Sequence, residues 1–280
     1  MRLKSNFGLP PLTFAGSKAR FFLIMKKSAL HQLHVLGSVV TSTLSAWRGT
    51  SVIKAARQPP QLLKLYDMEG SPHCRIVREA LTALGLDVQI YPCPRGGQRF
   101  RPQVKQLGGK EQFPFLIDPN AKTQLYESRA IVDYLFLTYA GQAAPSSYRA
   151  AGRFQSLFGA LASAASGLRG VHARSGKNPA QMLELWSFES SPYSRLVRER
   201  MTELELPYIL HNLGKEQFAD MGPAAMRVIP GPYKPRPGGR REKLLAQHGR
   251  IQVPYLKDPN TGVAMYESSD IIAYLEQQYG

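Results

Sequence analysis

This chain of 280 residues contains one sequence pattern twice. Residues 64–84 align with residues 184–204 at an offset of 120, and residues 112–128 align with residues 252–268 at an offset of 140. The second copy therefore carries about 20 extra residues, which fall in the Pro-, Gly- and Arg-rich segment 214–248. Because each copy is long enough to bury a core of its own, the repeat predicts two domains of one fold in tandem.

Each copy predicts the same order of elements, β-α-β-(α)-β-β-α, which is an α/β fold with a mixed sheet. In the first copy the strand LLKLYDME leads to Ser71, a favoured helix cap, and to Pro72, favoured at the first helical position. Apolar side chains at helical spacing continue this helix to about Leu84. Further strands are expected at VQIYP, QFPFLI and LYES, and a closing helix is expected with Ser128, or Ser268 in the second copy, as its cap.

The repeat also suggests where the domains begin and end. TSTLSAWRG and ASAASGLRG match at an offset of 121, and both are interpreted as helices that lead into their domains. The segment IPGPYKPRPGGRREK contains too much Pro, Gly and charge for a helix or an interior strand. The expected units are a basic extension at 1–35, a lead-in helix at 36–61, a first domain at 62–141, a linker with a second lead-in helix at 142–181, and a second domain at 182–280 with a basic insertion at 214–248.

Positive charge is concentrated outside the expected domain cores. The formal net charge of +16 comes from 36 basic and 20 acidic side chains, and residues 1–60 hold 9 Lys or Arg and no acid. Basic residues also dominate 94–110, 141–180 and 214–250. Such segments attract phosphates, anionic lipid or an acidic small ligand, or they are simply solvated loops.

Cysteine content and the start of the chain bear on the compartment. Two cysteines, Cys74 and Cys93, exclude a disulfide scaffold and fit a reducing, cytoplasmic environment. Alternatively, the first 25–35 residues are a transit peptide for a plastid or mitochondrion, or Met25 is the physiological start. No apolar run approaches the length of a membrane span, so no integral membrane segment is expected.

Three short motifs follow one another in each copy. They are Ser-Pro-x-Cys or Ser-Pro-x-Ser at a helix start, a proline that opens the third strand, and Glu-Ser at the end of the fourth. Each motif is weak alone, but three in order, twice, resemble the thioredoxin-like N-terminal domain of glutathione S-transferases and the related glutaredoxins. The resemblance covers about residues 62–140 and 182–280, and it implies a protein with two such domains in tandem.

The resemblance implies that each copy binds glutathione. The helix-start serine would face the glutathione sulfur, where the helix N-terminus favours a thiolate. The proline is expected to be cis, so that the residue before it pairs its backbone with the cysteinyl part of the ligand. The Glu-Ser pair would hold the γ-glutamyl ammonium and carboxylate groups. These residues are Ser71, Phe113, Pro114, Glu127 and Ser128 in the first copy, and Ser191, Val253, Pro254, Glu267 and Ser268 in the second. The alternative is that the serines only cap helices and the prolines only shape turns.

Two departures from the family pattern bear on catalysis. Glutaredoxin chemistry needs a thiolate at the first motif position, where both copies carry serine. Cys74, three residues further on, is then either a reactive nucleophile or a small core residue. The all-helical domain with which glutathione transferases bind the electrophile is replaced by the second copy. Serine still suits a transferase, because its hydroxyl can donate a hydrogen bond that lowers the pKa of bound glutathione.

Three functions therefore stay open. The first is a glutathione-binding, transferase-like protein with Ser71 and Ser191 at the catalytic position and glutathione as ligand or cosubstrate. The second is a non-catalytic thioredoxin-fold binding or scaffold protein, and the third is a glutaredoxin-like oxidoreductase that uses Cys74. The basic loops are expected beside the ligand cleft, where they capture an anionic ligand or dock a protein partner. No metal motif and no recognised nucleic-acid reader occurs in the sequence, so neither a metal nor a nucleic acid is expected as a partner.

Overall fold

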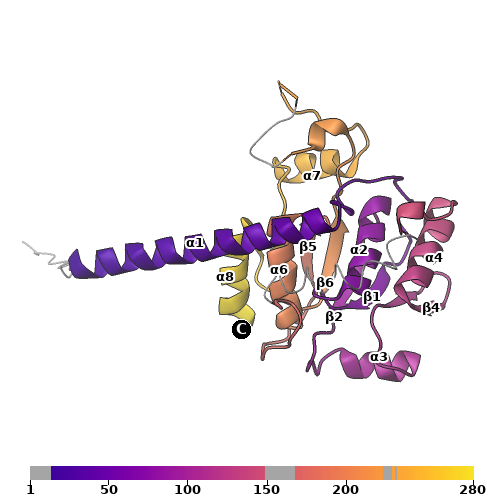
Figure 1. Ribbon diagram of the computed structural model, residues 1–280, viewed down its shortest axis with the longest axis horizontal. Coiled ribbons are helices and arrows are strands. Elements are labelled where there is room, and N and C mark those ends of the chain that lie inside the picture. Colours follow the sequence, from indigo (N-terminus) through magenta and orange to yellow (C-terminus); the bar gives the residue numbers. More distant parts are fainter. Residues whose placement is uncertain (1–13, 149–167, 223–228, 231) are drawn as a thin grey trace, which may run out of the picture.

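A single mixed sheet runs through both repeats. The computed structural model describes residues 14–148, 168–222, 229–230 and 232–280, with side chains described from residue 29 onward. The strands of these residues lie in the order β4-β3-β1-β2-β6-β5-β7-β8 (Figure 1). They are β1 (Leu63–Asp67), β2 (Val88–Pro92), β3 (Phe115–Asp118) and β4 (Thr123–Tyr126) in the first repeat, and β5 (Leu183–Ser187), β6 (Tyr208–Asn212), β7 (Tyr255–Asp258) and β8 (Val263–Tyr266) in the second.

The helices follow the predicted order in each repeat. They are α1 (Phe14–Leu44), α2 (Pro72–Leu84), α3 (Arg101–Gly108) and α4 (Ser128–Ala140), then α6 (Pro192–Glu203), the 3-10 turn η1 (Phe218–Asp220), α7 (Arg240–His248) and α8 (Ser268–Tyr279). Each repeat thus has the order β-α-β-α-β-β-α, which confirms the predicted α/β fold of two thioredoxin-like domains.

The seam between the repeats is an antiparallel pairing of β2 with β6. Val88 pairs with Leu210 and Ile90 with Tyr208. Within each repeat the first two strands are parallel, and the third and fourth are added antiparallel on the far side. The two repeats are therefore related by an approximate twofold axis that passes through the seam.

The main core lies on the helix-covered face of this sheet and belongs to both repeats. Leu65 and Val77 from the first repeat and Leu185 and Val197 from the second are in one buried cluster. Because neighbouring residues of a strand point to opposite faces, Tyr66 instead joins a smaller aromatic cluster, which α3 covers. One continuous core is what makes the tandem a single folded unit.

The helices that lead into the domains differ from the prediction. A helix is expected over 36–61, but α1 ends at Leu44, and the chain then turns through Ala46, Trp47 and Gly49, all with positive φ. These left-handed residues redirect the chain toward the other repeat, which a continued helix would not allow. The second lead-in helix, expected within 142–181, falls largely outside the described residues.

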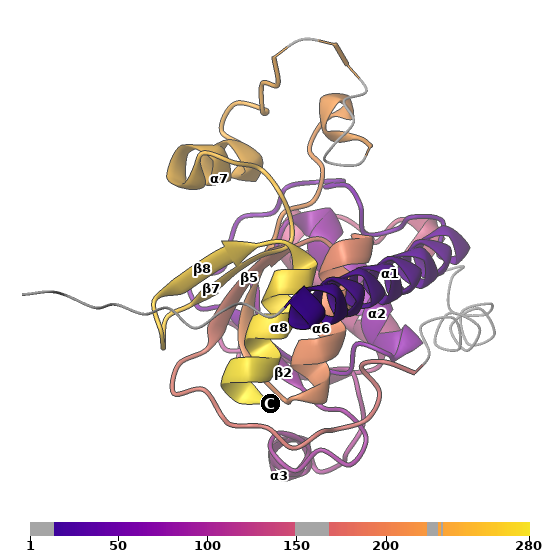
Figure 2. The ribbon, with the colours of Figure 1, turned by 90° about the vertical axis from the view of Figure 1, so that its left-hand side faces the viewer.

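The basic insertion also contains more regular structure than its composition predicts. A helix is not expected there, yet α7 begins at Arg240, one residue after Gly239 ends the Pro- and Gly-rich stretch. Leu244 of α7 is 2% exposed, so tertiary packing holds this short helix in place. The insertion projects from the body of the molecule (Figure 2).

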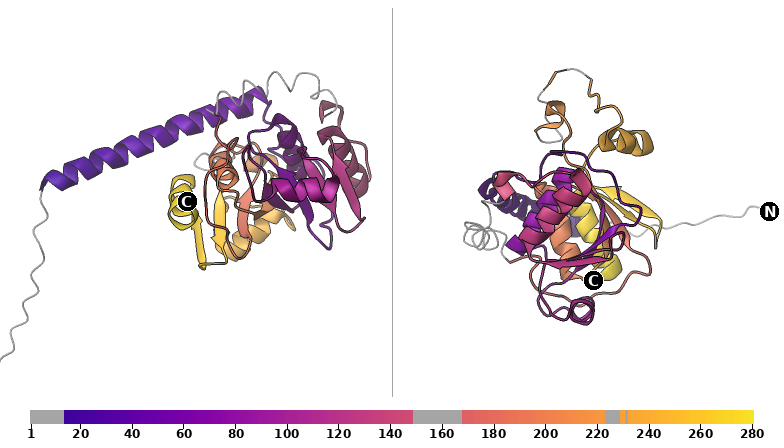
Figure 3. Two further views of the ribbon diagram at one scale, coloured as in Figure 1. Left: turned by 90° about the horizontal axis from the view of Figure 1, so that it is seen from below. Right: turned by 90° about the vertical axis from the view of Figure 1, so that its right-hand side faces the viewer.

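Helix α1 crosses the helices of the second repeat and continues well beyond them (Figures 1 and 3). Its C-terminal part is attached to the body by hydrogen bonds, including one from the Ser42 hydroxyl to the Ser190 carbonyl at 2.9 Å. No helix of the described residues is long and apolar enough to cross a membrane.

Candidate functional site

Strand direction brings the predicted site residues to one edge of the sheet in each repeat. β1 and β4 both end beside the start of β3, where Phe115 pairs with Tyr66 on one side and with Tyr126 on the other. The helix start after β1, the proline before β3 and the Glu-Ser pair after β4 therefore lie at the same edge. In the second repeat β5, β7 and β8 have the same arrangement, with Tyr255 as the shared residue.

The proline turn has the same form in both repeats. The Phe113–Pro114 and Val253–Pro254 peptide bonds are both cis, as the resemblance predicts. Each proline is buried, and the residue before it is half-buried where the chain enters the strand.

Glu127 and Glu267 adjoin these turns and have an unusual backbone. Their φ angles are 65° and 68°, in the left-handed region that non-glycine residues rarely adopt. Both side chains are exposed. The Gln112 amide donates to the Glu127 carboxylate, and the Gln252 amide donates to the Glu267 carboxylate at 2.8 Å. Outliers of this kind, held in two independent copies, are typical of ligand sites.

The prediction that Ser128 and Ser268 cap helices is wrong. Helices α4 and α8 begin at these serines, the cap positions are taken by Glu127 and Glu267, and neither glutamate makes a capping hydrogen bond through its side chain. The left-handed glutamate starts the helix one residue earlier, so the serine is already its first helical residue. The first N–H groups of the helix are then available to an anion. We call the place where the proline turn meets the Glu-Ser pair the Glu-Ser corner of each repeat.

The serines that precede α2 and α6 are buried helix caps. Ser71 is 7% exposed and Ser191 is 3% exposed. Each hydroxyl oxygen accepts a hydrogen bond from a backbone N–H, that of Cys74 at 3.4 Å or that of Ser194 at 3.3 Å, so the predicted caps are confirmed. A hydroxyl that accepts in this way still has its own proton to donate, so capping and facing a sulfur are chemically compatible.

The turn before Ser71 is covered by a segment of the second repeat. The Gly70 N–H donates to the Gly170 carbonyl at 3.3 Å, and a Cβ at Gly70 would lie 2.4 Å from the Val171 side chain. The segment is held by the loop after β2, because the Arg95 N–H donates to the Val171 carbonyl at 2.7 Å. We call residues 170–174, and their counterparts 49–53 in the first repeat, the crossover segments.

The second serine turn is covered reciprocally by the first repeat. The Ser190 N–H donates to the Gly49 carbonyl at 3.2 Å, and the Ser190 hydroxyl contacts that of Thr50. The Lys215 N–H donates to the Thr50 carbonyl at 2.8 Å, which holds this segment beside the loop after β6. Each serine turn is therefore covered by the crossover segment of the other repeat.

Helices α2 and α6 share a buried ion cluster below these segments. Arg78 of the first repeat contacts Glu189 of the second at 2.9 Å, and Arg198 contacts Glu69 at 2.9 Å, so each arginine bridges the repeats. Arg78 also pairs with Asp67. All five side chains are at most 6% exposed. Breaking such a cluster is costly, because it leaves a buried charge without its partner.

Sequence reasoning did not find this cluster. The spacing of its apolar residues predicts an apolar buried face for this helix, yet its charged residues are buried as well. Their identity in the two copies is the signal that would have shown it, since exposed charges have no reason to match. The matching residues are Arg75, Arg78 and Glu79 in α2, and Arg195, Arg198 and Glu199 in α6.

Burial and ion pairing shift the pKa values of the carboxylates in this region in opposite directions. Burial raises the pKa of Asp67 to about 6 and that of Glu199 to about 7, although arginines oppose both shifts. Burial acts on Glu189 in the same direction, but Arg198 and Arg78 outweigh it and lower its pKa to about 2. The central Glu189 is therefore charged near neutral pH, whereas Glu199 titrates there.

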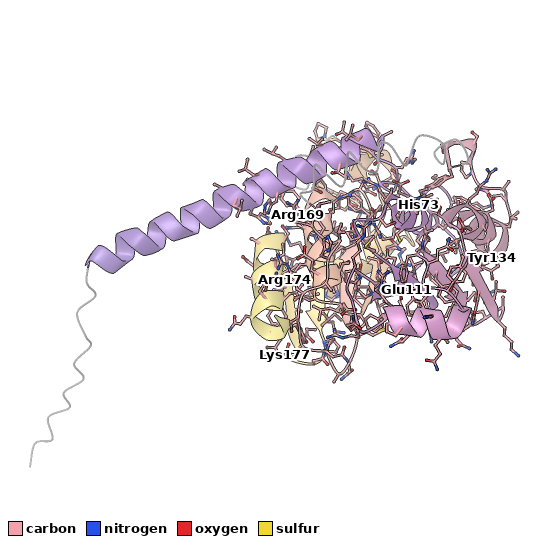
Figure 4. All side chains as sticks on the ribbon, turned by 60° about the horizontal axis from the view of Figure 1, so that its bottom comes forward. His73, Glu111, Tyr134, Arg169, Arg174 and Lys177 are labelled. Carbon is pink, nitrogen blue, oxygen red and sulfur yellow. The ribbon has the colours of Figure 1, made fainter. Side chains whose placement is uncertain are left out.

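Both cysteines are free and fully buried. Burial raises the pKa of the Cys74 thiol to about 12, and that of Cys93 well above its usual range. Both are protonated near neutral pH, and a protonated thiol does not attack a disulfide. His73, beside Ser71 in sequence, is exposed at the surface of the first repeat (Figure 4).

Helix α1 makes the two Glu-Ser corners unequal. Ser268 is 4% exposed, and its hydroxyl lies 3.0 Å from Nε2 of His31 in α1, whereas Ser128 is half-buried. His31 also lines a cleft of about 200 Å³ between α1, α6 and α8, together with Arg169 below α1 (Figure 4). Burial lowers the pKa of His31, although Asp270 opposes this shift, so the neutral imidazole is favoured.

Arginines of the basic loops hold the repeats together. The Arg99 guanidinium donates to the carbonyls of Gly176 at 2.9 Å and Glu205 at 2.6 Å, both in the second half of the chain. Arg240 of the insertion pairs with Asp87 of the first repeat. An external partner for these loops remains a prediction. Within the described part of the chain, no group of three or more His, Cys, Asp or Glu side chains could hold a metal ion.

Comparison with known proteins places the chain in a family. The family model "Glutathione S-transferase, N-terminal domain" matches residues 65–143 and again residues 185–280. A search of curated proteins found no match. Among solved structures, a delta-class glutathione transferase of Nilaparvata lugens is 31% identical, with a TM-score of 0.25, over 30% of this chain and 38% of that one. Since the two family matches span more than half of the residues, the chain belongs to the glutathione S-transferase N-terminal domain family and carries two such thioredoxin-like domains in tandem.

Proposed function

We propose that this protein binds glutathione at the corner formed by the proline turn and the Glu-Ser pair, and that it functions as a glutathione transferase-like protein. The observation that carries the proposal is the left-handed glutamate, which adjoins a cis-proline turn in the same way in both repeats. The carbonyl of each glutamate accepts a hydrogen bond from the first turn of the helix that follows, but the exposed carboxylates make no capping hydrogen bond. A ligand site explains why both copies retain them.

Each part of the corner suits a part of the ligand. The exposed Glu127 carboxylate is available for the γ-glutamyl ammonium, and Ser128 with the start of α4 is available for the γ-glutamyl carboxylate. The backbone of Phe113 can pair with the cysteinyl part in the manner of an added strand. Glu267, Ser268 and Val253 are the counterparts in the second repeat.

Catalysis makes a further demand on Ser71 and Ser191. A transferase needs the serine hydroxyl at the glutathione sulfur, so the crossover segments must open during turnover. The burial of Ser71 and Ser191 favours a second candidate function, a glutathione-binding protein without transferase turnover. The third function, redox chemistry at Cys74, gains no support from a buried thiol with a pKa of about 12.

Calorimetric titration with glutathione tests the binding site. We expect wild type to bind, and Glu127→Ala combined with Glu267→Ala to weaken binding about tenfold or more, since a charge-assisted hydrogen bond is lost in each repeat. Glu242→Ala, which removes a carboxylate from the insertion, is the control and should bind like wild type. No binding by wild type would sink the proposal.

Turnover assays separate the candidate functions. Conjugation of glutathione to an aryl halide that is lost in Ser71→Ala with Ser191→Ala, and retained in Cys74→Ser, supports the transferase. Binding without conjugation in wild type supports the second candidate. Disulfide reduction that Cys74→Ser abolishes would instead establish the thiol oxidoreductase.

A further inference from the structure

Helix α1 presents an apolar stripe to solvent. Leu30, Leu33, Leu36, Val40 and Leu44 are 40–63% exposed. At 100° per residue these five positions fall on one side of the helix, within about a third of its circumference. Trp47, just beyond the helix end, is 41% exposed as well. We call the five helical residues the leucine stripe.

The side of α1 that packs on the body is mostly polar. Ser38, Thr41 and Ser42 are at most 3% exposed, beside one apolar side chain, Val35, at 6%. The Thr41 carbonyl accepts from Arg75, and the Ser42 hydroxyl donates to a carbonyl. A surface helix normally turns its apolar side to the core and its polar side to water. In α1 most of the buried side chains are polar while five large apolar ones face water, and a contiguous exposed apolar surface of this kind marks an interaction site.

The charge of α1 indicates what covers the stripe. The helix contains Lys18, Arg20, Lys26 and Lys27 and no acidic residue, within a segment 1–60 that has 9 basic residues and no acid. All four lie in the N-terminal half of α1. This half of the helix extends beyond the body (Figures 1 and 3). Two copies of such an arm repel each other, whereas an anionic surface attracts it. No helix of the described residues is long and apolar enough to span a bilayer, so the helix would lie on the surface.

We propose that α1 docks this protein on an anionic lipid membrane, with the leucine stripe in the boundary between headgroups and acyl chains. Apolar burial and attraction of the basic arm to acidic headgroups act together in such a helix. The polar side of α1 then stays on the protein body, so docking needs no rearrangement of the fold. This proposal is independent of glutathione binding.

Sedimentation with lipid vesicles tests the proposal on the full chain. We expect binding to vesicles of phosphatidylcholine mixed with phosphatidylglycerol, weaker binding at high salt, and little binding to phosphatidylcholine alone. Lys26→Gln with Lys27→Gln should weaken binding roughly fivefold for each charge removed at low salt. Equal binding to both vesicles, or binding to neither, would overturn the proposal.

Two leucine variants test the stripe itself. Leu33→Ser with Leu36→Ser should weaken vesicle binding by about tenfold or more for each leucine. Leu137→Ser on α4, where the leucine is 59% exposed but lies on another surface, is the matched control and should bind like wild type. All three leucines are exposed, so thermal unfolding should show that the variants fold normally. An equal loss in the control contradicts docking through α1. Light scattering tests the alternative that the stripe binds a second copy of the chain. A wild-type dimer that becomes a monomer in the double variant would contradict membrane docking.

Discussion

Arg198 shows how much one buried side chain contributes to this fold. Its guanidinium is fully buried and contacts Glu69 of the first repeat and Glu189 of the second. Removing charges from water costs free energy, which only the complete set of partners offsets. The cluster therefore acts as a unit, and the loss of one member leaves the others unfavourably buried.

Replacement of Arg198 by methionine should lower the free energy of unfolding by about 3–5 kcal/mol, because two carboxylates lose a buried partner. Urea titration followed by circular dichroism measures this change. Arg174→Met is the control, since Arg174 is 49% exposed in its pair with Glu276 and should contribute less than about 1 kcal/mol. Similar losses of unfolding free energy in the two variants would show that the buried cluster stabilises the fold no more than an exposed ion pair does.

Glu199 should make stability depend on pH. Its folded pKa is about 7 and its ordinary value is 4.5, so the folded state holds the proton more tightly than the unfolded state. The resulting stabilisation is full below pH 4.5 and is lost as the pH rises through about 7. Wild type should therefore lose up to about 3 kcal/mol relative to Glu199→Gln across this range, measured by urea titration at several pH values. If wild type instead gained stability relative to Glu199→Gln as the pH rises, the raised pKa of Glu199 would be contradicted.

Among the elements, the crossover segments distinguish this tandem from two independent domains. Each segment precedes the first strand of its own repeat but lies over the serine turn of the other repeat. They require glycine, because the backbones approach closely: a Cβ at Gly49 would lie 2.7 Å from the Glu189 Cβ.

Gly49→Ala should be more destabilising than Gly262→Ala. Both glycines have a left-handed backbone, with φ of 73° and 74°, so both variants incur the same conformational strain of about 1 kcal/mol. Only Gly49 has neighbours within reach of a Cβ, so it should lose about 1–3 kcal/mol more. Thermal or urea unfolding of the two variants makes the comparison, and equal losses would mean that the segment can shift without cost.

Helix α1 should control the second glutathione corner, if the proposed function holds. His31→Ala frees the Ser268 hydroxyl, so glutathione should bind the second repeat roughly tenfold more tightly. Calorimetry in a Glu127→Ala background isolates that repeat. The exposed neighbour Gln32 provides the control, and Gln32→Ala should change nothing. Unchanged binding in His31→Ala would show that α1 does not restrict this corner.

In the whole molecule, one sheet and one core join the two repeats. The β2–β6 seam leaves neither central strand with a free edge, and the buried ion cluster requires both repeats to be folded. Unfolding of either repeat exposes charged and apolar groups of the other. The tandem should therefore unfold in a single transition.

Leu65→Ala in the first repeat should shift the unfolding of the second. The leucine is fully buried in the shared core, so its truncation should lower the free energy of unfolding by about 2–5 kcal/mol. Fluorescence of Trp186, recorded in a Trp47→Phe background, follows the second repeat, and circular dichroism follows the whole. Leu185→Ala provides the reciprocal variant. Separate transitions for the two probes would contradict a single cooperative unit.

The local features of the chain could be predicted because short segments carry them. The sequence predicts a strand at VQIYP, and β2 is found at Val88–Pro92; Ser71 and Ser191 cap their helices as expected. Strand alternation, capping and the residue before a proline act within a few positions. One exception is also local: the sequence predicts a cap at Ser128, because the left-handed backbone of Glu127 before it gives no signal in the sequence.

The sequence by itself determined the repeat, the order of elements in each copy and the three motifs that carry the family resemblance. Only the tertiary structure decided that β2 pairs with β6, that each repeat covers the serine of the other, and that α1 turns its leucines outward. The physical reason is sequence distance. Arg78 and Glu189 are 111 residues apart, and the free energy that buries them arises only when both repeats are in place. No local pattern records such a contact, apart from the charged residues that the two copies have in common.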